Sequence, residues 1–406
     1  MQPQGCQEGK VVHNSPRRRR VKAHSRIGLL WTTFKSRLPL RGVRILSFHP
    51  QILRKRHILG AGCSVCGEYP MASQVTTRLL DFANTRLAHD EAKELHRCTV
   101  QTCEWMMKFG VETIDQLAGR LNGSEPGVIR DAKMAMSVYF LSIEEAAVGH
   151  ALKNYTAFFE ELFRFGVSDL LQERVRVTPC RVITYNYDRI FERTFIEWAK
   201  IVDCNNEDLS GSPDEFLRKY LNTGLGDPYK LNFDLNHFTL LKIHGGVGQF
   251  NRVTDGGFKH IYQPNFGSHI PEFIDKNYYK PAGYSKDLHT IIFPADKKVK
   301  NLSADEDSLF EYMRKIEEQT FEFCKKAQEI QIIGYSIQPI DYFSFKSMIR
   351  EAKDCKRIVV RNRISEKSRI MRTLEGLKEE FAAKWEVEFK AEDFFGIETQ
   401  STTTRD

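Results

Sequence analysis

The chain has 406 residues, which is enough for two or three average domains or for one large α/β domain with insertions. Its composition is that of an ordinary globular protein, and no apolar run approaches the ~20 residues that span a bilayer, so we expect no contact with a membrane. Nine cysteines without a secreted disulfide pattern favour a reducing compartment, and we expect a cytoplasmic protein.

The net charge of +7 is unevenly distributed along the chain. Residues 1–56 hold 14 Lys or Arg and one acid, Glu8, so this segment carries +13 and the remainder carries −6. A mildly acidic body argues against nucleic-acid binding by the main domain. Residues 1–56 are open to three interpretations, namely a basic arm for nucleic acid, an Arg-rich transit peptide and a disordered extension. We favour the disordered extension, because the chain around His57 reads as the start of a first strand.

The first expected elements are a short apolar strand that ends at Leu59 and a helical region over residues 72–175. Within that region, apolar residues recur at helical spacing, a strong break falls at 122–127, and long amphipathic helices are expected over 132–165. The paired acids Glu144-Glu145 are expected on a solvated face.

Strands and helices alternate in the rest of the chain. The expected strands are 177–184, 238–243, 289–293, 330–333, 357–361 and 385–389, and the expected helices are 189–202, 303–327, 341–353 and 369–385. Residues 204–236 read as a polar, turn-rich insertion. This pattern predicts an α/β fold, a doubly wound Rossmann-like parallel sheet with a helical insertion. We expect one domain over 57–396 and a disordered tail over 397–406.

The turn after the first strand is suited to a phosphate group. Gly60 and Gly62 have no Cβ, so the backbone can turn tightly and approach a pyrophosphate, and exposed N–H groups attract anions. The next glycine, Gly67, comes five residues after Gly62 instead of the three of a dinucleotide fingerprint. On this motif alone, a plain glycine turn is an equal alternative.

Four motifs that follow expected strands, taken together and in order, resemble the sirtuin-like NAD-consuming superfamily. The resemblance covers about residues 57–395. Asn362, after a late strand, also fits the pattern. The motifs are Gly60-Ala61-Gly62-Cys63-Ser64 with Pro70, Thr184-Tyr185-Asn186-Tyr187-Asp188, Lys242-Ile243-His244-Gly245 and Ile332-Ile333-Gly334-Tyr335-Ser336.

The chain departs from the protein deacylases of that superfamily. Deacylases carry two Cys-x-x-Cys pairs in a zinc module after the catalytic histidine, whereas only Cys324 and Cys355 follow His244 here. We therefore expect no metal, and we reject a zinc site built on Cys63, because this cysteine lies inside the phosphate loop. The tyrosine before Asp188 resembles the bacterial branch, whose members hydrolyse NAD in anti-phage defence.

The resemblance implies NAD as the substrate and assigns roles to individual residues. Asn186 would orient a ribose hydroxyl and a water, His244 would accept a proton, and Asp188 would fix the loop or polarise a partner. NAD would also contact Gly60, Ala61, Gly62, Cys63, Ser64 and Pro70 at the diphosphate, and Gly334, Ser336 and Asn362 at the adenosine side. Without the other motifs, Asn186 and Asp188 read as helix caps and His244 as a turn residue.

The expected function is that of an NAD glycohydrolase, which yields nicotinamide and ADP-ribose and acts in anti-phage defence by depleting NAD. Since unrestrained hydrolysis would kill the cell, we expect control by homo-oligomer assembly or by a partner protein. The alternatives are a protein deacylase, an ADP-ribosyltransferase, and a catalytically inactive nucleotide-binding regulatory subunit.

Overall fold

The structure is a computed structural model of the whole chain. Most of the expected basic extension and the whole expected tail, 397–406, lie outside the residues that it describes. Those residues are 55–70, 74–88, 93–121, 124–163, 171–172, 181–211, 213–221, 238–247, 249–254, 257–262, 287–289, 291, 293 and 304–391.

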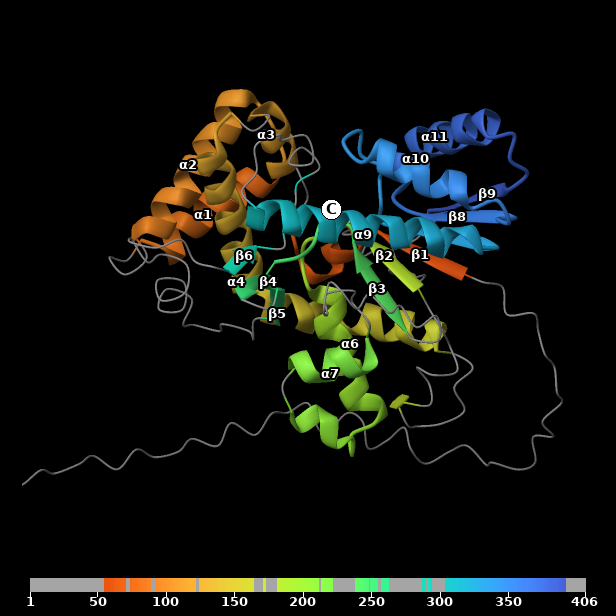
Figure 1. Cartoon of the computed structure of the whole chain (residues 1–406), viewed down its shortest axis with the longest axis horizontal. Coiled ribbons are helices and arrows are strands. Elements are labelled where there is room, and N and C mark those ends of the chain that lie inside the picture. The colour runs from red at the N-terminus through yellow and green to blue at the C-terminus, as the bar shows by residue number, and fades with distance from the viewer. Residues whose placement is uncertain are drawn as a thin grey trace, which may run out of the picture. The chain divides into compact units, whose positions relative to one another are not determined.

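A six-stranded parallel sheet lies at the centre of the described chain, with the strand order β3-β2-β1-β7-β8-β9 (Figure 1). Leu59 at the end of β1 is in register with Thr184 of β2 on one side and with Ile333 of β7 on the other. The order reverses between β1 and β7, which is where doubly wound folds bind ligands. The strands are β1 (Lys55–Leu59), β2 (Arg181–Thr184), β3 (Thr239–Lys242), β7 (Glu329–Ile333), β8 (Arg357–Arg361) and β9 (Glu386–Lys390). The predicted fold class is confirmed.

Strand β1 begins earlier than the sequence pattern indicates. Lys55 and Arg56 pair with Glu329 and Ile330 of β7, so they belong to the sheet and not to the basic extension that was expected to end at residue 56. The Arg56 side chain is buried and donates to the main-chain oxygen of Phe323 at 2.6 Å. This bond explains how a basic residue can occupy a position inside a parallel sheet.

Helices cover both faces of the sheet, because successive strand residues point to opposite sides. On one face, α4 (Pro126–Leu162), α6 (Ile190–Val202) and α7 (Pro213–Tyr220) pack on Leu59, Val182 and Leu240. On the other face, α9 (Ala304–Lys325), α10 (Tyr342–Glu351) and α11 (Lys367–Glu380) pack on Ile58, Ile183 and Val360. Helix α7 lies in a region that was expected to be a turn-rich insertion, and α11 ends at Glu380, before the expected position.

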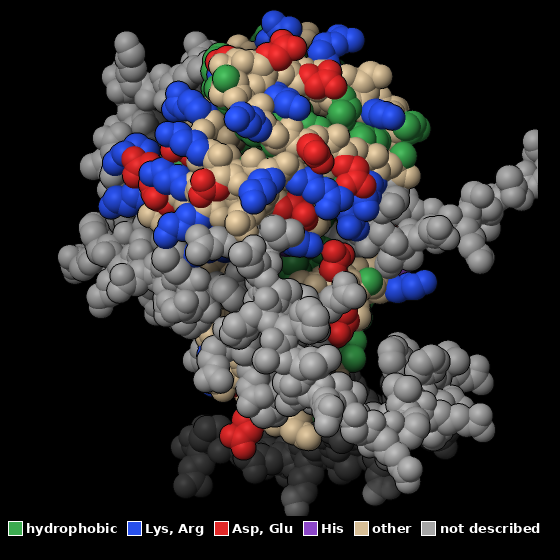
Figure 2. All heavy atoms as spheres, turned by 90° about the vertical axis from the view of Figure 1, so that its right-hand side faces the viewer, with side chains coloured by type: hydrophobic (Ala, Val, Ile, Leu, Met, Phe, Trp, Pro, Cys, Tyr) green, Lys and Arg blue, Asp and Glu red, His purple; other side chains and the backbone are tan. Residues whose placement is uncertain are grey.

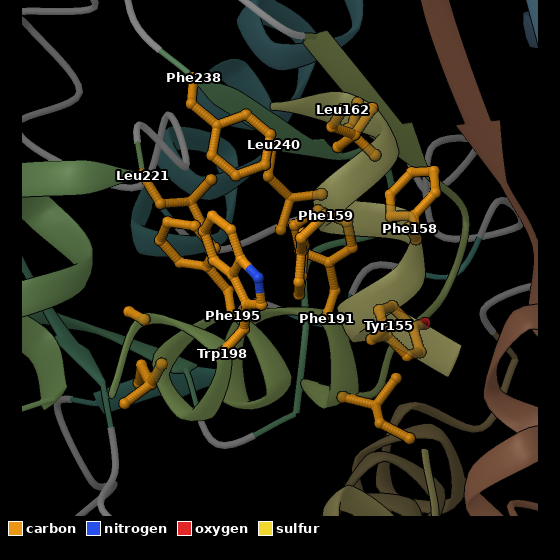
Figure 3. Packing of buried hydrophobic residues seen from close by; sticks show 14 of the residues in the cluster. Tyr155, Phe158, Phe159, Leu162, Phe191, Phe195, Trp198, Leu221, Phe238 and Leu240 are labelled. Atoms are coloured by element: carbon orange, nitrogen blue, oxygen red, sulfur yellow. The ribbon is translucent and has the colours of Figure 1, made fainter. Parts of the chain in front are cut away.

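The core between α4 and α6 is mainly aromatic (Figure 3). Phe159 of α4 packs edge-to-face on Phe191 at 5.2 Å between ring centroids, and Phe163 stacks on Trp198 at 5.2 Å. Aromatic pairs of this geometry contribute about 0.5–1.5 kcal/mol each beyond the area they bury. This core fixes α6, and therefore the loop that precedes it, against the sheet.

Helices α1 (Val75–Arg86), α2 (Lys93–Phe109) and α3 (Ile114–Leu121) form the predicted helical insertion together with the first half of α4. The expectation of several helices over 132–165 was wrong, since α4 is a single helix of 37 residues. At 1.5 Å per residue it is about 55 Å long. Its first half packs in the insertion and its second half on the sheet, so the buried face differs between the two halves and no single polar face runs along the whole helix.

The chain between β3 and α9 contributes a second, antiparallel sheet of three strands in the order β5-β4-β6. Its strands are β4 (Gln249–Thr254), β5 (Gly257–Tyr262) and β6 (Asp287–His289). The strand expected at 289–293 was therefore placed too late, and β6 does not belong to the parallel sheet. Among the described helices, none is long and apolar enough to cross a membrane.

Candidate functional site

The loops after β1 and β7 meet at the point where the strand order reverses. The N–H of Gly60 donates to Ile333 O at 3.0 Å, and that of Gly62 donates to Gly334 O at 2.9 Å. A Cβ on Gly60 would lie 2.4 Å from Cα of Tyr335, and Gly334 has a φ of 60°, which favours glycine. Glycine is thus required here so that the two loops can touch. The Gly62 N–H, expected to face a diphosphate, is engaged inside the protein.

The first loop continues as a short 3₁₀ helix, Ala61–Gly67, in which Cys63 and Ser64 are buried and Ala61 is exposed. The Cys63 thiol donates to Ile333 O at 3.1 Å, and burial raises the pKa of this thiol well above its ordinary value. Cys63 therefore stays protonated and serves packing. The Ser64 hydroxyl donates to Oδ2 of Asp188 at 2.6 Å, which joins the first loop to the loop after β2.

Asn186 follows β2 and reaches across to the first loop. Its Nδ2 donates to Gly60 O and to Ser64 Oγ, both at 3.0 Å. Its Oδ1 is buried and has no hydrogen-bond partner among the described residues. The side chain therefore does not cap the next helix, and it presents a free amide oxygen. A buried acceptor without a partner is costly, which points to a ligand that supplies the missing donor.

Asp188 has two structural contacts. Its Oδ1 accepts from the N–H of Ile190, the first residue of α6, at 3.0 Å, while Oδ2 accepts from Ser64. Burial raises the pKa of the Asp188 carboxyl, and the positive charge of Lys242 opposes this shift. Asp188 thus combines the predicted helix-cap role with fixing the loop around Asn186.

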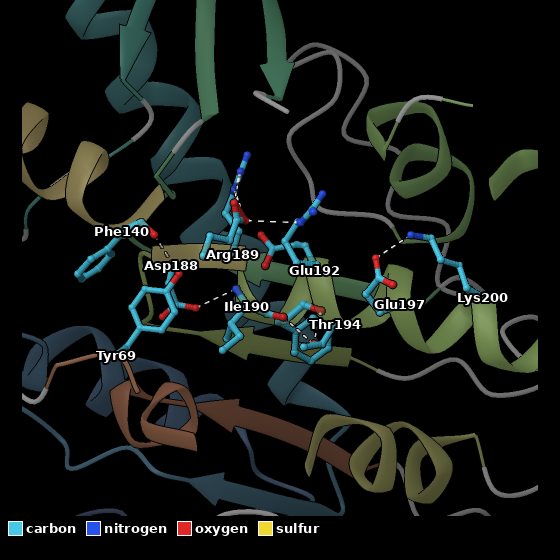
Figure 4. Close-up of polar contacts among 12 residues, drawn as sticks. Tyr69, Phe140, Asp188, Arg189, Ile190, Glu192, Thr194, Glu197 and Lys200 are labelled. Carbon is cyan, nitrogen blue, oxygen red and sulfur yellow. Dashed lines mark hydrogen bonds and ion pairs between the residues drawn. The ribbon is translucent and has the colours of Figure 1, made fainter. Parts of the chain in front are cut away.

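A buried set of charges lies beneath this loop (Figure 4). Lys242 of β3 donates from Nζ to the main-chain oxygen of Asp188 and to Oε1 of Glu192, the latter at 3.0 Å. Arg189 is fully buried and donates from Nε to Oε1 of Glu144 at 3.1 Å. The expectation that Glu144 lies on a solvated face was wrong. Its pairing with Arg189 ties the middle of α4 to the site loop.

His244 follows β3 and packs against both neighbours of Asn186. Its ring stacks on Tyr187 with centroids 5.7 Å apart and meets Tyr185 edge-on at 5.5 Å. Nε2 lies 2.8 Å from Oδ1 of Asp341, whereas Nδ1 is buried without a hydrogen-bond partner among the described residues. Three buried polar atoms of this site thus have no hydrogen-bond partner among the described residues, namely the Tyr185 hydroxyl, Asn186 Oδ1 and His244 Nδ1, and the last two belong to predicted catalytic side chains.

Asp341 is the functional candidate that sequence reasoning missed. It directly precedes α10, where an acid would be expected to act as a helix cap, but its side chain makes no capping bond. The carboxylate instead contacts His244, 97 residues away in the chain, and its Oδ2 accepts from the Tyr335 hydroxyl at 3.4 Å. No local motif links these residues. The one available signal was an acid shortly after the glycine turn that follows a strand.

The other predicted contact residues have mixed placements. Asn362 donates from Nδ2 to Tyr335 O at 3.2 Å and accepts from the Arg363 N–H at 2.8 Å, so its side chain braces the loop after β7. Ser336 and Pro70 are partly exposed.

The two cysteines after His244 are buried. Burial raises the pKa of the Cys324 thiol to about 12 and that of Cys355 to about 11. Throughout the described part of the chain, no three His, Cys, Asp or Glu side chains are grouped as metal ligands. A separate surface hollow on α6 and α7, lined by Arg193, Lys200 and Phe216 among others, contains none of the predicted site residues.

Comparison with known proteins adds little to this geometry. No protein-family model and no curated protein matches the chain. Among solved structures, the chain is similar to the structure of Sir2Tm bound to a propionylated peptide. The identity is 13%, the TM-score is 0.30, and the match covers 76% of this chain and 80% of that one. A similarity at this level supports no conclusion about function.

Proposed function

We propose that the chain is an NAD glycohydrolase that cleaves NAD to nicotinamide and ADP-ribose. The observation that carries the proposal is the pair of orphaned buried atoms, Asn186 Oδ1 and His244 Nδ1, beside the glycine loops where the strand order reverses. An acceptor on an amide and a nitrogen on an imidazole are the groups needed to hold a ribose hydroxyl and to take a proton from water.

The chemistry follows from the bond that breaks. Nicotinamide is a cationic pyridinium while it is attached to the ribose, and it leaves as a neutral molecule with the bonding electron pair. The transition state has oxocarbenium character at C1′, and water completes the reaction by adding there. Asn186 orients the ribose and the water through its free oxygen, and His244 accepts the proton that the water releases.

The first loop supports substrate binding more than chemistry in this proposal. The exposed Ala61 and the partly exposed Gly62 stand at the mouth of the loop, whereas Cys63 and Ser64 lie beneath them. We infer that the diphosphate lies over this loop and that the adenosine side extends toward Gly334 and Ser336. The side chains of Ser64, Asp188 and Asn362 hold the loops in position beneath it.

We further propose that the enzyme acts in anti-phage defence by depleting NAD and that oligomer assembly or a partner protein controls it. Supporting features are the tyrosine before Asp188, the lack of two Cys-x-x-Cys pairs after His244, and the hazard of uncontrolled NAD loss. The body of the chain is proposed to bind no nucleic acid, because its net charge is negative.

Incubation of the purified full chain with NAD tests the activity, with nicotinamide, ADP-ribose and acyl-ADP-ribose separated by chromatography. We expect equal amounts of nicotinamide and ADP-ribose, unchanged when an acylated peptide is added. Acyl-ADP-ribose would instead assign a deacylase, and ADP-ribose on protein would assign a transferase. Binding of NAD without any product, also in lysate from phage-infected cells, would favour the inactive regulatory subunit.

A further inference from the structure

The two ring nitrogens of His244 have different surroundings. Nε2 lies 2.8 Å from a carboxylate oxygen of Asp341, and Nδ1 has no hydrogen-bond partner among the described residues. A carboxylate only accepts hydrogen bonds, so the neutral imidazole must carry its proton on Nε2. The lone pair is then on Nδ1, the nitrogen without a partner.

We propose that Asp341 is a positioning residue that holds His244 as the Nε2–H tautomer, so that Nδ1 is the proton acceptor of the site. This positioning role deepens the proposed function, and the expected effect of Asp341 on turnover rests on that function. Asp341 is placed to act through His244 by the same logic that lets a carboxylate orient the histidine of a hydrolase triad.

The surroundings of Asp341 favour a positioning role over a helix-capping role. Its carboxylate makes no hydrogen bond to the N–H groups of α10, although an acid at this position would normally bind them. Its second oxygen accepts from the Tyr335 hydroxyl, and the Tyr335 ring stacks on Tyr185 at 4.2 Å. The carboxylate thus has a second contact besides His244, and each of its oxygens has a partner.

The His244 ring is also held in its plane. Tyr187 stacks on one face, and the Tyr187 hydroxyl donates to Asp115 of α3 at 2.5 Å. Rotation of the ring by 180° about the Cβ–Cγ bond would exchange Nε2 with Cε1 and break the contact with Asp341, and the ring would have to pass these tyrosines to do so. The tyrosines and Asp341 together define one ring orientation.

Replacement of the carboxylate by the isosteric amide, Asp341→Asn, tests the proposal. The amide oxygen can accept from a protonated Nε2, and the amide NH₂ can donate to an unprotonated Nε2, so the tautomer is no longer fixed; the amide oxygen is also a weaker acceptor than a carboxylate. We expect kcat for NAD to fall about 100- to 10,000-fold, with KM changed little because Asp341 does not touch the substrate. The control is Asp131→Asn, which makes the same change at a buried acid of α4, and this variant should leave kcat unchanged.

A nuclear magnetic resonance experiment gives a readout that does not need turnover. With ¹⁵N-labelled histidine and His244→Gln for assignment, the wild type should show the Nε2–H tautomer and a deshielded, slowly exchanging Nε2 proton. That proton signal should be lost in Asp341→Asn and kept in Asp131→Asn. If the wild type showed the Nδ1–H tautomer, or if Asp341→Asn kept both the signal and kcat, the proposal would be wrong.

This design separates the two hypotheses. If the wild type binds NAD but hydrolyses none, the proposed function fails, yet the tautomer of His244 still decides the role of Asp341. If Asp341→Asn does not fold, the wild-type tautomer alone decides it. A purely structural role would lower the yield or stability of the variant while leaving kcat per folded molecule unchanged.

Discussion

At the scale of single residues, the site depends on which buried polar atoms are satisfied. Ser64 links the two loops, because its hydroxyl accepts from Asn186 and donates to Asp188. The two carboxylate oxygens of Asp188 and the Nδ2 of Asn186 also have partners inside the protein. Among the side-chain polar atoms of Ser64, Asn186 and Asp188, Oδ1 of Asn186 alone has no hydrogen-bond partner in the described part of the chain. The loops after β1 and β2 are thus held together around this free acceptor, as preorganised catalytic groups require.

His57 in β1 gives a prediction about acid stability. It is buried edge-on to Phe158 at 5.5 Å, and burial, aided by the charges of Lys55, Arg361 and Arg56, lowers its pKa from 6.5 to about 3. Below pH 6.5 the unfolded chain takes up a proton that the folded chain refuses, so stability falls as the pH falls from 6.5 towards 3. The loss from this residue between pH 7 and 4.5 should be about 2–3 kcal/mol.

Urea unfolding at both pH values, for the wild type and for His57→Leu, measures this loss. The variant should lose less stability on acidification than the wild type. His150→Leu, which alters an exposed histidine, should keep the wild-type pH dependence. An equal slope for all three chains would show that His57 is not the acid-sensitive group.

At the scale of secondary-structure elements, α4 is the feature that the sequence described least well. This helix packs in the insertion at one end and on the sheet at the other, so its buried face changes along its length. The 3.6-residue pattern that reveals a surface helix is therefore blurred, and Glu144 read as solvated because its partner is distant in sequence. By contrast, helices α9, α10 and α11 each cover one face of the sheet and were predicted close to their observed bounds.

The pair of Glu144 and Arg189 should be important for stability, because both side chains are buried to 99% or more. Glu144→Gln leaves the guanidinium without its counter-charge, and breaking such a pair by removing one partner costs about 3–5 kcal/mol. Glu145→Gln is the matched control, since the neighbouring acid is exposed, and it should change stability by no more than about 0.5 kcal/mol.

Equilibrium unfolding in denaturant compares these two variants with the wild type. Because the pair fixes the start of α6, Glu144→Gln should also lower NAD hydrolysis at temperatures where it remains folded. Similar stabilities for Glu144→Gln and Glu145→Gln would contradict the assignment of a buried ion pair that joins α4 to the site loop.

At the scale of the whole molecule, the alternation of strands and helices was sufficient to predict the parallel sheet. Polar residues directly after strands were sufficient to predict its carboxyl edge, because parallel strands all end on the same side. The partners within the site were not predictable. Asp341 contacts His244, which is 97 positions away in the chain, and Ser64 contacts Asn186, which is 122 positions away. Patterns in a single sequence carry no information on such distant contacts.

The surface of the described chain gives no sign of one dominant charge on the face seen in Figure 2, where basic and acidic side chains alternate. The described side chains on that face form no continuous basic track of the kind that binds a nucleic-acid backbone.

The most direct test of the central claim is nicotinamide release from NAD by the wild type and by Asn186→Ala, with NAD binding of both measured by calorimetry. We expect that Asn186→Ala folds and binds NAD within a few-fold of the wild type, because the backbone bonds that join the two glycine loops remain, but that it loses at least about 100-fold in nicotinamide release, because the free amide oxygen is removed. Nicotinamide release by Asn186→Ala at the wild-type rate would contradict the account.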